Sequence, residues 1–492
     1  MDTISSRTAG LLALSIVVLY VVQKALSLRK TLGLAGCVRS FRQSLEGIID
    51  RKAACFPEGI NINVANAAAI KEITSSRARF PKPIEIYESL TIFGSNIVAS
   101  EGELWKKYRK IAAPAFNDRN NRLVWDESAR IVLGLFDQVW NNKDMVVVDH
   151  CVRDVTLPVA LFVIGVAGFG RSISWQEDLS IPSSHKIPFK EALSGVSQDV
   201  FIKLASPEWL LGATERLRHV KLAFEELDKY MSDMIHDRRT AEKKEERYDL
   251  FSSLLDANDM PGDSGEAPLT KRELIGNIFI FLLAGHETTA HTLAFTFGLL
   301  AFYQEEQEIL YQQIKSIIPD GRIPTYEEMP LFTQSMAVFY ETLRMFPPVC
   351  GVPKVSAEDT TLVAENASGE TKLVPVPAGS PITLSVVGLH YNPRYWKDPH
   401  EFRPSRFRDP DWPRDAFLPF SGGARACIGR KFFETEGIAI LTMLVSRYKI
   451  TLKEEPQFAG ETMEEKRVRV FATKPGLTIS PVRMPLVFTR RK

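Results

Sequence analysis

The stretch FSGGARACIG, residues 420–429, decides how the rest of the chain is interpreted. It holds a single cysteine, Cys427, in a glycine-rich loop, and the long apolar pattern that follows predicts a helix starting next to this cysteine. Backbone N–H groups at a helix start favour a thiolate, and Arg425 adds positive charge two residues away. Gly422 and Gly429 allow the backbone to turn closely around whatever the sulfur binds. The stretch therefore predicts a cysteine thiolate that acts as a ligand.

The surroundings of this cysteine restrict what it can bind. A single thiolate with no second cysteine or histidine nearby cannot complete a zinc site. It can be the axial ligand of a haem iron, and the alternative is a buried structural cysteine beside a glycine turn. Phe420, Gly423, Arg425, Cys427 and Gly429 match the signature F-x-x-G-x-R-x-C-x-G, so the stretch resembles the cytochromes P450, the haem-thiolate monooxygenases. The resemblance implies haem b with Cys427 as its axial ligand, and it implies that Phe420, Arg425 and Gly429 bind the cofactor.

Composition and charge exclude several other classes. The chain has 492 residues, of which 45% are apolar and 25% charged, as in a folded globular protein. The net charge of +1 gives no reason to expect a nucleic-acid partner. The five cysteines are scattered and odd in number, which fits a reducing compartment without a disulfide framework.

The N-terminal segment predicts a membrane anchor. Residues 9–28 read AGLLALSIVVLYVVQKALSL, and a spanning helix needs roughly 20 apolar residues, with Lys24 reaching the interface. Basic residues from Lys24 to Lys30 follow the run, which places the downstream chain on the cytosolic side. A secretory signal peptide is the rival interpretation, but no small-residue cleavage site follows. We expect residues 1–30 to be the anchor and 31–492 to be the catalytic domain.

A second motif lies in a long apolar helix. The capping box TKRE at Thr270 opens a run of about thirty helical residues, with AGHETT at 284–289 in its middle. An acid beside an alcohol is costly in an apolar helix but is tolerated where the pair lines a cavity and handles protons. The alternative is a glutamate and a threonine facing solvent on an amphipathic helix.

This motif resembles [A/G]-G-x-[D/E]-T-T of the same family. The resemblance implies that Gly285 leaves space for O₂ and that Glu287 and Thr288 deliver protons for its cleavage. Adjacent residues cannot share a helix face, so we assign Glu287 to a neighbouring water chain and Thr288 to the oxygen itself.

Two further patterns match positions that hold the haem carboxylates in the family. Trp105 and Arg109 share one helix face at i and i+4 and resemble W-x-x-x-R, in which both residues contact a propionate. Taken alone, the pair is typical of a cation–π contact at the surface. Lys354 falls, on a strand expected over 349–355, where many relatives place a basic residue that binds a propionate.

A third set of residues predicts a structural network. Glu341 and Arg344 at i and i+3 are a weak signal, since an exposed pair contributes under about 1 kcal/mol. The later stretch FRPSRF, residues 402–407, resembles F-x-P-E-R-F of the family, with Ser405 where the family has glutamate. The resemblance implies that Arg406 completes a buried Glu–Arg–Arg network that locks the loop carrying the thiolate.

The order and spacing of these motifs imply a mainly helical P450 fold with a smaller β-rich part. The implied reaction is hydroxylation or epoxidation of a lipophilic small molecule by O₂, with electrons from NADPH through a separate, membrane-bound cytochrome reductase. The anchor implies a single-pass protein of the endoplasmic reticulum with a cytosolic catalytic domain, which would leave the glycosylation acceptor at Asn366 unused. The FRPSRF stretch and the spacing are similar to those of fungal members, which favours secondary metabolism.

Two other functions stay open at this point. A haem-thiolate isomerase or dehydratase would rearrange a peroxide without external electrons, but such relatives often lose the acid–alcohol pair that is intact at Glu287 and Thr288. A non-catalytic haem binder would have no reason to keep that pair in an apolar helix. NADPH consumption with a reductase separates the first from a monooxygenase, and turnover on a broad substrate panel separates the second.

Overall fold

The structure is a computed structural model that describes residues 53–55, 59–171, 175, 181–240, 248–259, 268–365 and 370–491. The predicted anchor in residues 1–30 and the glycosylation acceptor at Asn366 lie outside the described residues.

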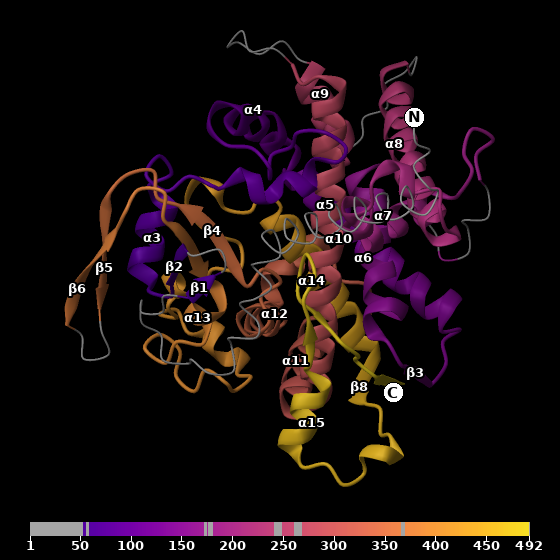
Figure 1. The fold of residues 1–492 in the computed structure, drawn as a ribbon. Helices are drawn as coiled ribbons and strands as arrows, with labels where there is room; N and C mark the ends of the chain where they lie inside the picture. Colours follow the sequence, from indigo (N-terminus) through magenta and orange to yellow (C-terminus); the bar gives the residue numbers. More distant parts are fainter. Residues whose placement is uncertain are drawn as a thin grey trace, which may run out of the picture.

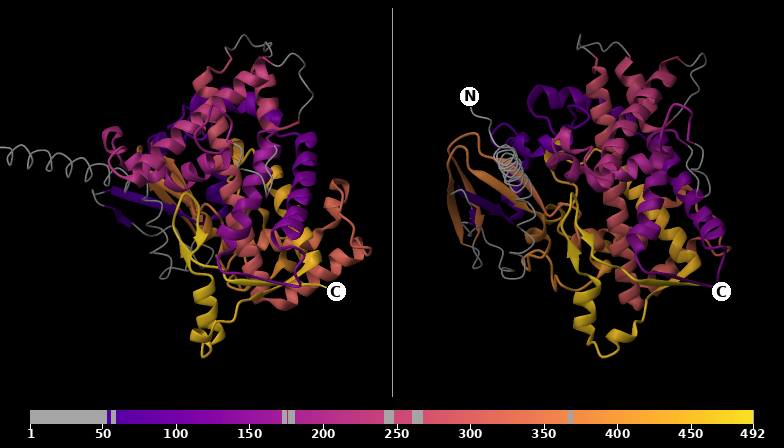
Figure 2. Two further views of the ribbon diagram at one scale, coloured as in Figure 1. Left: turned by 90° about the vertical axis from the view of Figure 1, so that its right-hand side faces the viewer. Right: turned by 45° about the vertical axis from the view of Figure 1, so that its right-hand side comes forward.

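Most of the described chain is helical, as the motifs predict (Figure 1). The α-helices are α3 Ala67–Ser75, α4 Gly102–Ala112, α5 Asp118–Gly134, α6 Leu157–Val163, α7 Phe189–Ala205, α8 Glu215–Thr240, α9 Leu250–Asp259, α10 Lys271–Phe302, α11 Gln304–Ile317, α12 Thr333–Met345, α13 Val386–His390, α14 Arg430–Arg447 and α15 Met463–Val470. In all three views of Figures 1 and 2, α15 projects from the lower end of the molecule.

Helix α10 is the centre of the helical part (Figure 1). It begins at the predicted capping box, in which the Thr270 side chain accepts from the Glu273 N–H and the Glu273 side chain accepts from the Thr270 N–H. Among the described residues it is the helix long and apolar enough to cross a membrane, but 72% of its most apolar window is buried inside the protein. It packs against α6, α12 and α14 and is therefore a core helix.

The strands form small sheets beside the helices (Figures 1 and 2). They are β1 Ala53–Cys55, β2 Gly59–Val64, β3 Met145–Val148, β4 Gly351–Val355, β5 Thr360–Glu365, β6 Thr371–Val376, β7 Pro381–Ser385, β8 Tyr448–Leu452, β9 Thr473–Lys474, β10 Ser480–Pro481 and β11 Leu486–Arg490. The largest sheet has the order β1-β2-β7-β4, in which β2 and β7 are parallel and the other pairs antiparallel. The strand expected over 349–355 is β4, which begins two residues later, at Gly351.

The predicted Glu–Arg–Arg network is confirmed. Glu341 and Arg344 are fully buried on α12, and the carboxylate oxygens of Glu341 accept from Arg344 Nε at 2.7 Å and Nη2 at 2.8 Å. Arg406 Nε donates to the same carboxylate at 3.0 Å, and the backbone N–H of Arg403 also donates to it, at 2.9 Å. Arg344 also donates to the carbonyl of Pro399 at 2.8 Å. The network therefore fixes the backbone from about 397 to 406 against α12.

A histidine that no motif includes extends this network to the cysteine loop. His390 is fully buried at the end of α13, with Nδ1 3.0 Å from the Arg344 carbonyl oxygen, and its Nε2 accepts from the Leu418 N–H at 2.8 Å. Burial and the charge of Arg344 lower the pKa of His390 to about 3, so the ring is neutral and carries its proton on Nδ1. Within the loop, the Cys427 N–H donates to the Phe420 carbonyl at 2.9 Å.

We predict that Arg344→Ala destabilises the protein by about 3–5 kcal/mol, because it leaves the buried Glu341 carboxylate without two of its charged donors. The measurement is the free energy of unfolding in urea, together with the haem content of the purified protein. Arg403→Ala is the matched control, since its guanidinium is partly exposed and pairs with Asp398 at 3.1 Å at the surface. That change should cost under about 1 kcal/mol. Equal stability losses in the two variants would contradict the role of the network.

Candidate active site

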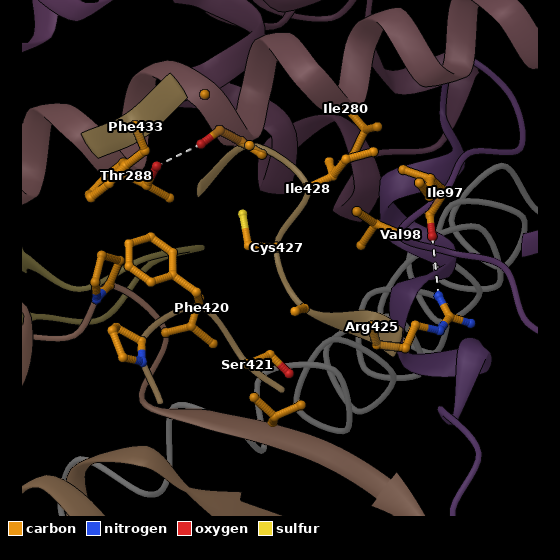
Figure 3. A pocket seen from close by; sticks show the side chains of 18 of the residues that line it. Ile97, Val98, Ile280, Thr288, Phe420, Ser421, Arg425, Cys427, Ile428 and Phe433 are labelled. Carbon is orange, nitrogen blue, oxygen red and sulfur yellow. Dashed lines mark hydrogen bonds between the residues drawn. The ribbon is translucent and has the colours of Figure 1, made fainter. Parts of the chain in front are cut away.

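A cavity of about 350 Å³ lies between the cysteine loop and helix α10 (Figure 3). Its wall is mostly apolar, and the remaining sides come from α4, from β4 and from the segment that precedes α4. Eight of the nine predicted site residues line it: Trp105, Arg109, Thr288, Lys354, Phe420, Arg425, Cys427 and Gly429. The structure therefore brings together residues that are more than 300 positions apart in the sequence, while Glu287 does not line the cavity.

The Cys427 sulfur points into the open centre of the cavity (Figure 3). Helix α14 begins three residues later at Arg430, close to the predicted position, and the Gly429 N–H donates to the sulfur. The positive charges of Arg109 and Arg430 also favour the thiolate. The sulfur is open to the cavity but enclosed by protein on its other sides, and this burial outweighs the other effects and raises the pKa of the free thiol. A cation in the cavity would reverse that balance.

The tight turn of the cysteine loop depends on a glycine other than the two expected. Gly423 has φ +62°, and a Cβ at this position would lie 2.1 Å from the Thr74 carbonyl oxygen. At Gly422 a Cβ would meet only the Thr74 side chain, at 3.1 Å, and at Gly429 its nearest neighbour would be Phe116 at 3.6 Å. The close approach of α3 to the loop is therefore what requires glycine, and it requires it at Gly423.

Arg425 has a different partner from the one predicted. Its guanidinium lies 2.7 Å from the Glu101 carboxylate, donates to the Ser100 carbonyl at 2.5 Å and sits 4.3 Å from the centre of the Trp105 ring. The cations that act on Cys427 are Arg109 and Arg430 instead. Arg425 thus belongs to the edge of the cavity, where the Trp105 ring supports its charge.

This edge of the cavity carries more positive than negative charge. Lys82, Lys354 and Arg425 line it, and Arg77 lies behind them, 4.0 Å from Glu101, the carboxylate that pairs with both arginines. Buried N–H groups of Arg77 and Arg425 have no hydrogen-bond partner in the described part of the chain. Burial, Arg425 and Lys354 lower the pKa of Lys82 to about 7. Four cations beside one carboxylate fit a bound group that carries carboxylates of its own.

Helix α10 supplies the wall opposite the cysteine loop. Thr288 lines the cavity and its hydroxyl donates to the Ala284 carbonyl at 2.8 Å (Figure 3). Gly285 also lines the cavity, and a Cβ there would lie 3.0 Å from the Ile164 side chain, so its absence keeps this part of the helix open. The buried Oε2 of Glu287 has no hydrogen-bond partner among the described residues, and burial raises the pKa of this carboxyl to about 7.

A second buried acid behind α10 was not found from the sequence. Thr289 donates to Glu436 Oε2 at 3.1 Å, and the other carboxylate oxygen has no partner among the described residues. Burial raises the pKa of Glu436 well above its usual range, which favours the protonated form of this acid. The one signal in the sequence is a carboxyl group directly before the apolar stretch 437–445 of α14.

Comparison with known proteins agrees with this arrangement. The family model of cytochrome P450 matches residues 60–478. Cytochrome P450 monooxygenase 124 of Postia placenta is 58% identical over 438 residues, which cover 89% of this chain and 84% of the relative. Cyclooctat-9-en-7-ol 5-monooxygenase of Streptomyces melanosporofaciens is 33% identical, covering 81% of this chain and 79% of the relative. Cytochrome P450 monooxygenase ORF6 of Penicillium roqueforti is 29% identical, and the match covers 84% of this chain and 76% of the relative.

The match covers most of the chain, and it includes the stretches that form the cavity, from Trp105 to the cysteine loop. Membership also implies a haem iron bound by a cysteine thiolate. The chain belongs to the cytochrome P450 family of monooxygenases, which are oxidoreductases.

Proposed function

We propose that this protein binds haem b through the Cys427 thiolate and inserts one oxygen atom of O₂ into a lipophilic small molecule. The observation that carries the proposal is the Cys427 sulfur, which opens into a cavity with the α10 motif on its far wall and excess positive charge at its edge. When bound, the haem supplies the iron at which O₂ is reduced and cleaved.

The residues around the cavity have distinct tasks in this proposal. The haem iron would favour the ionised Cys427 against the effect of burial, and the Gly429 N–H and the charge of Arg109 would assist it. Trp105, Arg109, Lys354 and Arg425 hold the two haem carboxylates, which would offset the excess charge and give the unpartnered guanidinium N–H groups an acceptor. Phe420 packs edge-on against Phe433, with 5.5 Å between the ring centres, and forms part of the cavity wall next to the thiolate.

Proton delivery falls to the acid–alcohol pair. The Thr288 hydroxyl lies at the cavity wall and can accept a proton from water on one side while donating to oxygen on the other. Glu287 acts from outside the wall, through water. Its pKa of about 7 means that a substantial fraction is protonated at neutral pH and can donate.

The apolar wall favours a substrate without charge. Ile97, Val98, Ile280 and Phe281 are among the residues that line the cavity. We propose hydroxylation or epoxidation of a lipophilic metabolite in secondary metabolism. The fungal relatives support this proposal, and so does the name of the Streptomyces relative, cyclooctat-9-en-7-ol 5-monooxygenase. Electrons would come from NADPH through a separate cytochrome reductase. Residues 1–30 would anchor the chain in the endoplasmic reticulum, with the catalytic domain in the cytosol.

The first test concerns the axial ligand. Cys427→Ala should abolish the absorption band that carbon monoxide produces with a reduced haem-thiolate protein, because no other thiolate lines the described cavity. Cys350→Ala is the control, since Cys350 is next to the lining residue Val349 but does not line the cavity itself. A band that persists in both variants would show that Cys427 is not the ligand.

The second test concerns proton delivery. Thr288→Ala should keep haem and consume NADPH but release hydrogen peroxide, with product formation lowered by about 10²-fold or more. The measured quantity is the ratio of product to NADPH consumed. Thr292→Val is the control on the same helix, because the Thr292 hydroxyl donates to the Thr288 carbonyl and Thr292 does not line the cavity. If the ratio in Thr288→Ala equalled that of the unchanged protein, Thr288 would not deliver protons.

The pH dependence of this ratio tests Glu287. Since burial raises its pKa to about 7, the carboxyl is mostly protonated below that pH and loses its proton above it. The ratio of product to NADPH should therefore fall as the pH rises through about 7. Glu287→Gln should lower the ratio and remove this pH step. A step of the same size in the glutamine variant would assign it to another group.

The third test concerns topology. Protease added to intact microsomes should digest the catalytic domain, because the basic residues after the apolar run place it in the cytosol. Removal of residues 1–30 should release the protein from the membrane fraction. Protection from protease, or a glycan at Asn366, would place the domain in the lumen.

A further inference from the structure

The segment 184–187, just before α7, lies along one face of α8. Four residues spaced by three and four positions form that face: Glu226, Lys229, Tyr230 and Asp233. The Lys229 ammonium donates to the Ser184 carbonyl. The Tyr230 hydroxyl donates to the Ile187 carbonyl at 2.9 Å, and the Glu226 carboxylate accepts from the Lys186 backbone N–H at 3.1 Å. Because α7 begins two residues after this segment, the contacts tie the start of α7 to α8.

His185 lies at the centre of this contact and faces a carboxylate with each ring nitrogen. Its Nδ1 is 2.9 Å from Glu226 Oε2, and its Nε2 is 3.3 Å from Asp233 Oδ2. The ring stacks on that of Tyr230, with 3.4 Å between the ring centres and 6° between the planes. The His185 side chain is 3% exposed and that of Glu226 5%, so solvent screens this pair little.

Two ionised carboxylates require a proton on each nitrogen of this ring, because a carboxylate can only accept. Burial acts to raise the pKa of Glu226, but the Lys186 N–H and the His185 ring outweigh burial and lower it, so Glu226 is held ionised. A ring that has lost one proton turns a bare nitrogen toward a carboxylate. The contact with α8 is therefore strongest while His185 is an imidazolium.

Charged groups from several elements surround the His185 ring. They are Glu226, Lys229 and Asp233 of α8, Lys186 beside it in the chain, Arg171 and Lys190 of α7. The Lys186 side chain is exposed, and the Lys190 ammonium lies over the Phe162 ring. The Arg171 guanidinium is 5.1 Å from the centre of the Tyr230 ring. The two carboxylates contact the ring nitrogens directly, so their effect exceeds that of the cations and favours the imidazolium.

We propose that residues 184–187 form a pH-sensitive strap, which is closed on α8 while His185 carries two ring protons and is released as the ring loses one. Such a strap controls how firmly the start of α7 is held. Helix α7 also reaches the acid–alcohol motif, because Ser197 Oγ lies 3.2 Å from His286 Nε2 on α10. The inference goes beyond the proposed function and does not depend on bound haem.

Hydrogen exchange at the Lys186 amide measures the closed strap directly, because this N–H donates to Glu226. The measured quantity is the protection factor, which removes the intrinsic effect of pH on exchange. In the full-length protein it should fall by about tenfold or more between about pH 5 and 8, the range in which histidines change charge. Ionisation of Glu226 would have the opposite effect, since the ionised carboxylate is the better acceptor.

Three variants assign this fall to the strap. His185→Gln keeps a neutral donor for Glu226 but cannot gain a charge, so its protection should not change with pH over this range. Asp233→Asn should make the fall smaller, because the asparagine amide can donate to the unprotonated ring nitrogen. His219→Gln is the matched control and should keep the full fall, since His219 lies on the same helix with its side chain 46% exposed and 4.0 Å from Glu191.

Two results would overturn the inference. One is protection of the Lys186 amide that stays constant with pH in the unchanged protein. The other is a fall of the same size in His185→Gln, which would assign the switch to another group. Should His185→Gln not fold, Asp233→Asn still decides the matter, because the Asp233 side chain is 41% exposed and an undiminished fall in that variant would contradict the strap.

Discussion

The buried carboxylate of Glu341 is the constraint on which the position of the cysteine loop depends. A fully buried carboxylate is tolerated only when donors surround it, and here two arginines and a backbone N–H supply them. Those donors come from α12 and from the segment around 403–406, so the carboxylate ties two distant parts of the chain together. Arg344 extends the connection because its carbonyl oxygen lies 3.0 Å from His390 Nδ1, and His390 in turn accepts from Leu418 at the start of the loop.

A rigid loop on one side and a central helix on the other leave a cavity whose polar groups are only partly satisfied. The Cys427 sulfur points into its centre, Arg425 and Lys82 line its edge, and Arg77 lies behind them; a buried N–H group of each arginine has no partner among the described residues. Each of these groups costs stability unless something in the cavity compensates it. A haem, with its iron and two carboxylates, would offer partners to the sulfur and to the cations that line the cavity.

The local motifs were predictable from the sequence because their meaning depends on spacing within one element. Cys427 beside a helix start, Trp105 and Arg109 on one helix face, and Thr288 in α10 all lie where the motifs place them, on the cavity wall. The helical fold with a smaller β-rich part followed from the same motifs. Such patterns require no knowledge of which distant segments meet.

Features that arise from contacts between distant segments could not be predicted from the sequence. Gly423 is needed because the Thr74 carbonyl approaches it, and Arg425 turns away from the thiolate because Glu101 lies near it. His390, Lys82 and Glu436 gain their surroundings from elements far away in the sequence, and a lone histidine, lysine or glutamate carries no pattern that would reveal this. The partners, and with them the charges and pKa shifts, depend on the tertiary structure.

The link from the buried carboxylate to the cysteine loop is most directly tested by hydrogen exchange at the Leu418 and Cys427 amides. His390→Ala removes the acceptor of the Leu418 N–H and leaves Glu341, Arg344 and Arg406 unchanged. We predict faster exchange at both amides in this variant, with exchange in α12 as slow as in the unchanged protein. Unchanged protection of both loop amides would contradict the account, since the loop would then hold its shape without the Glu341 network.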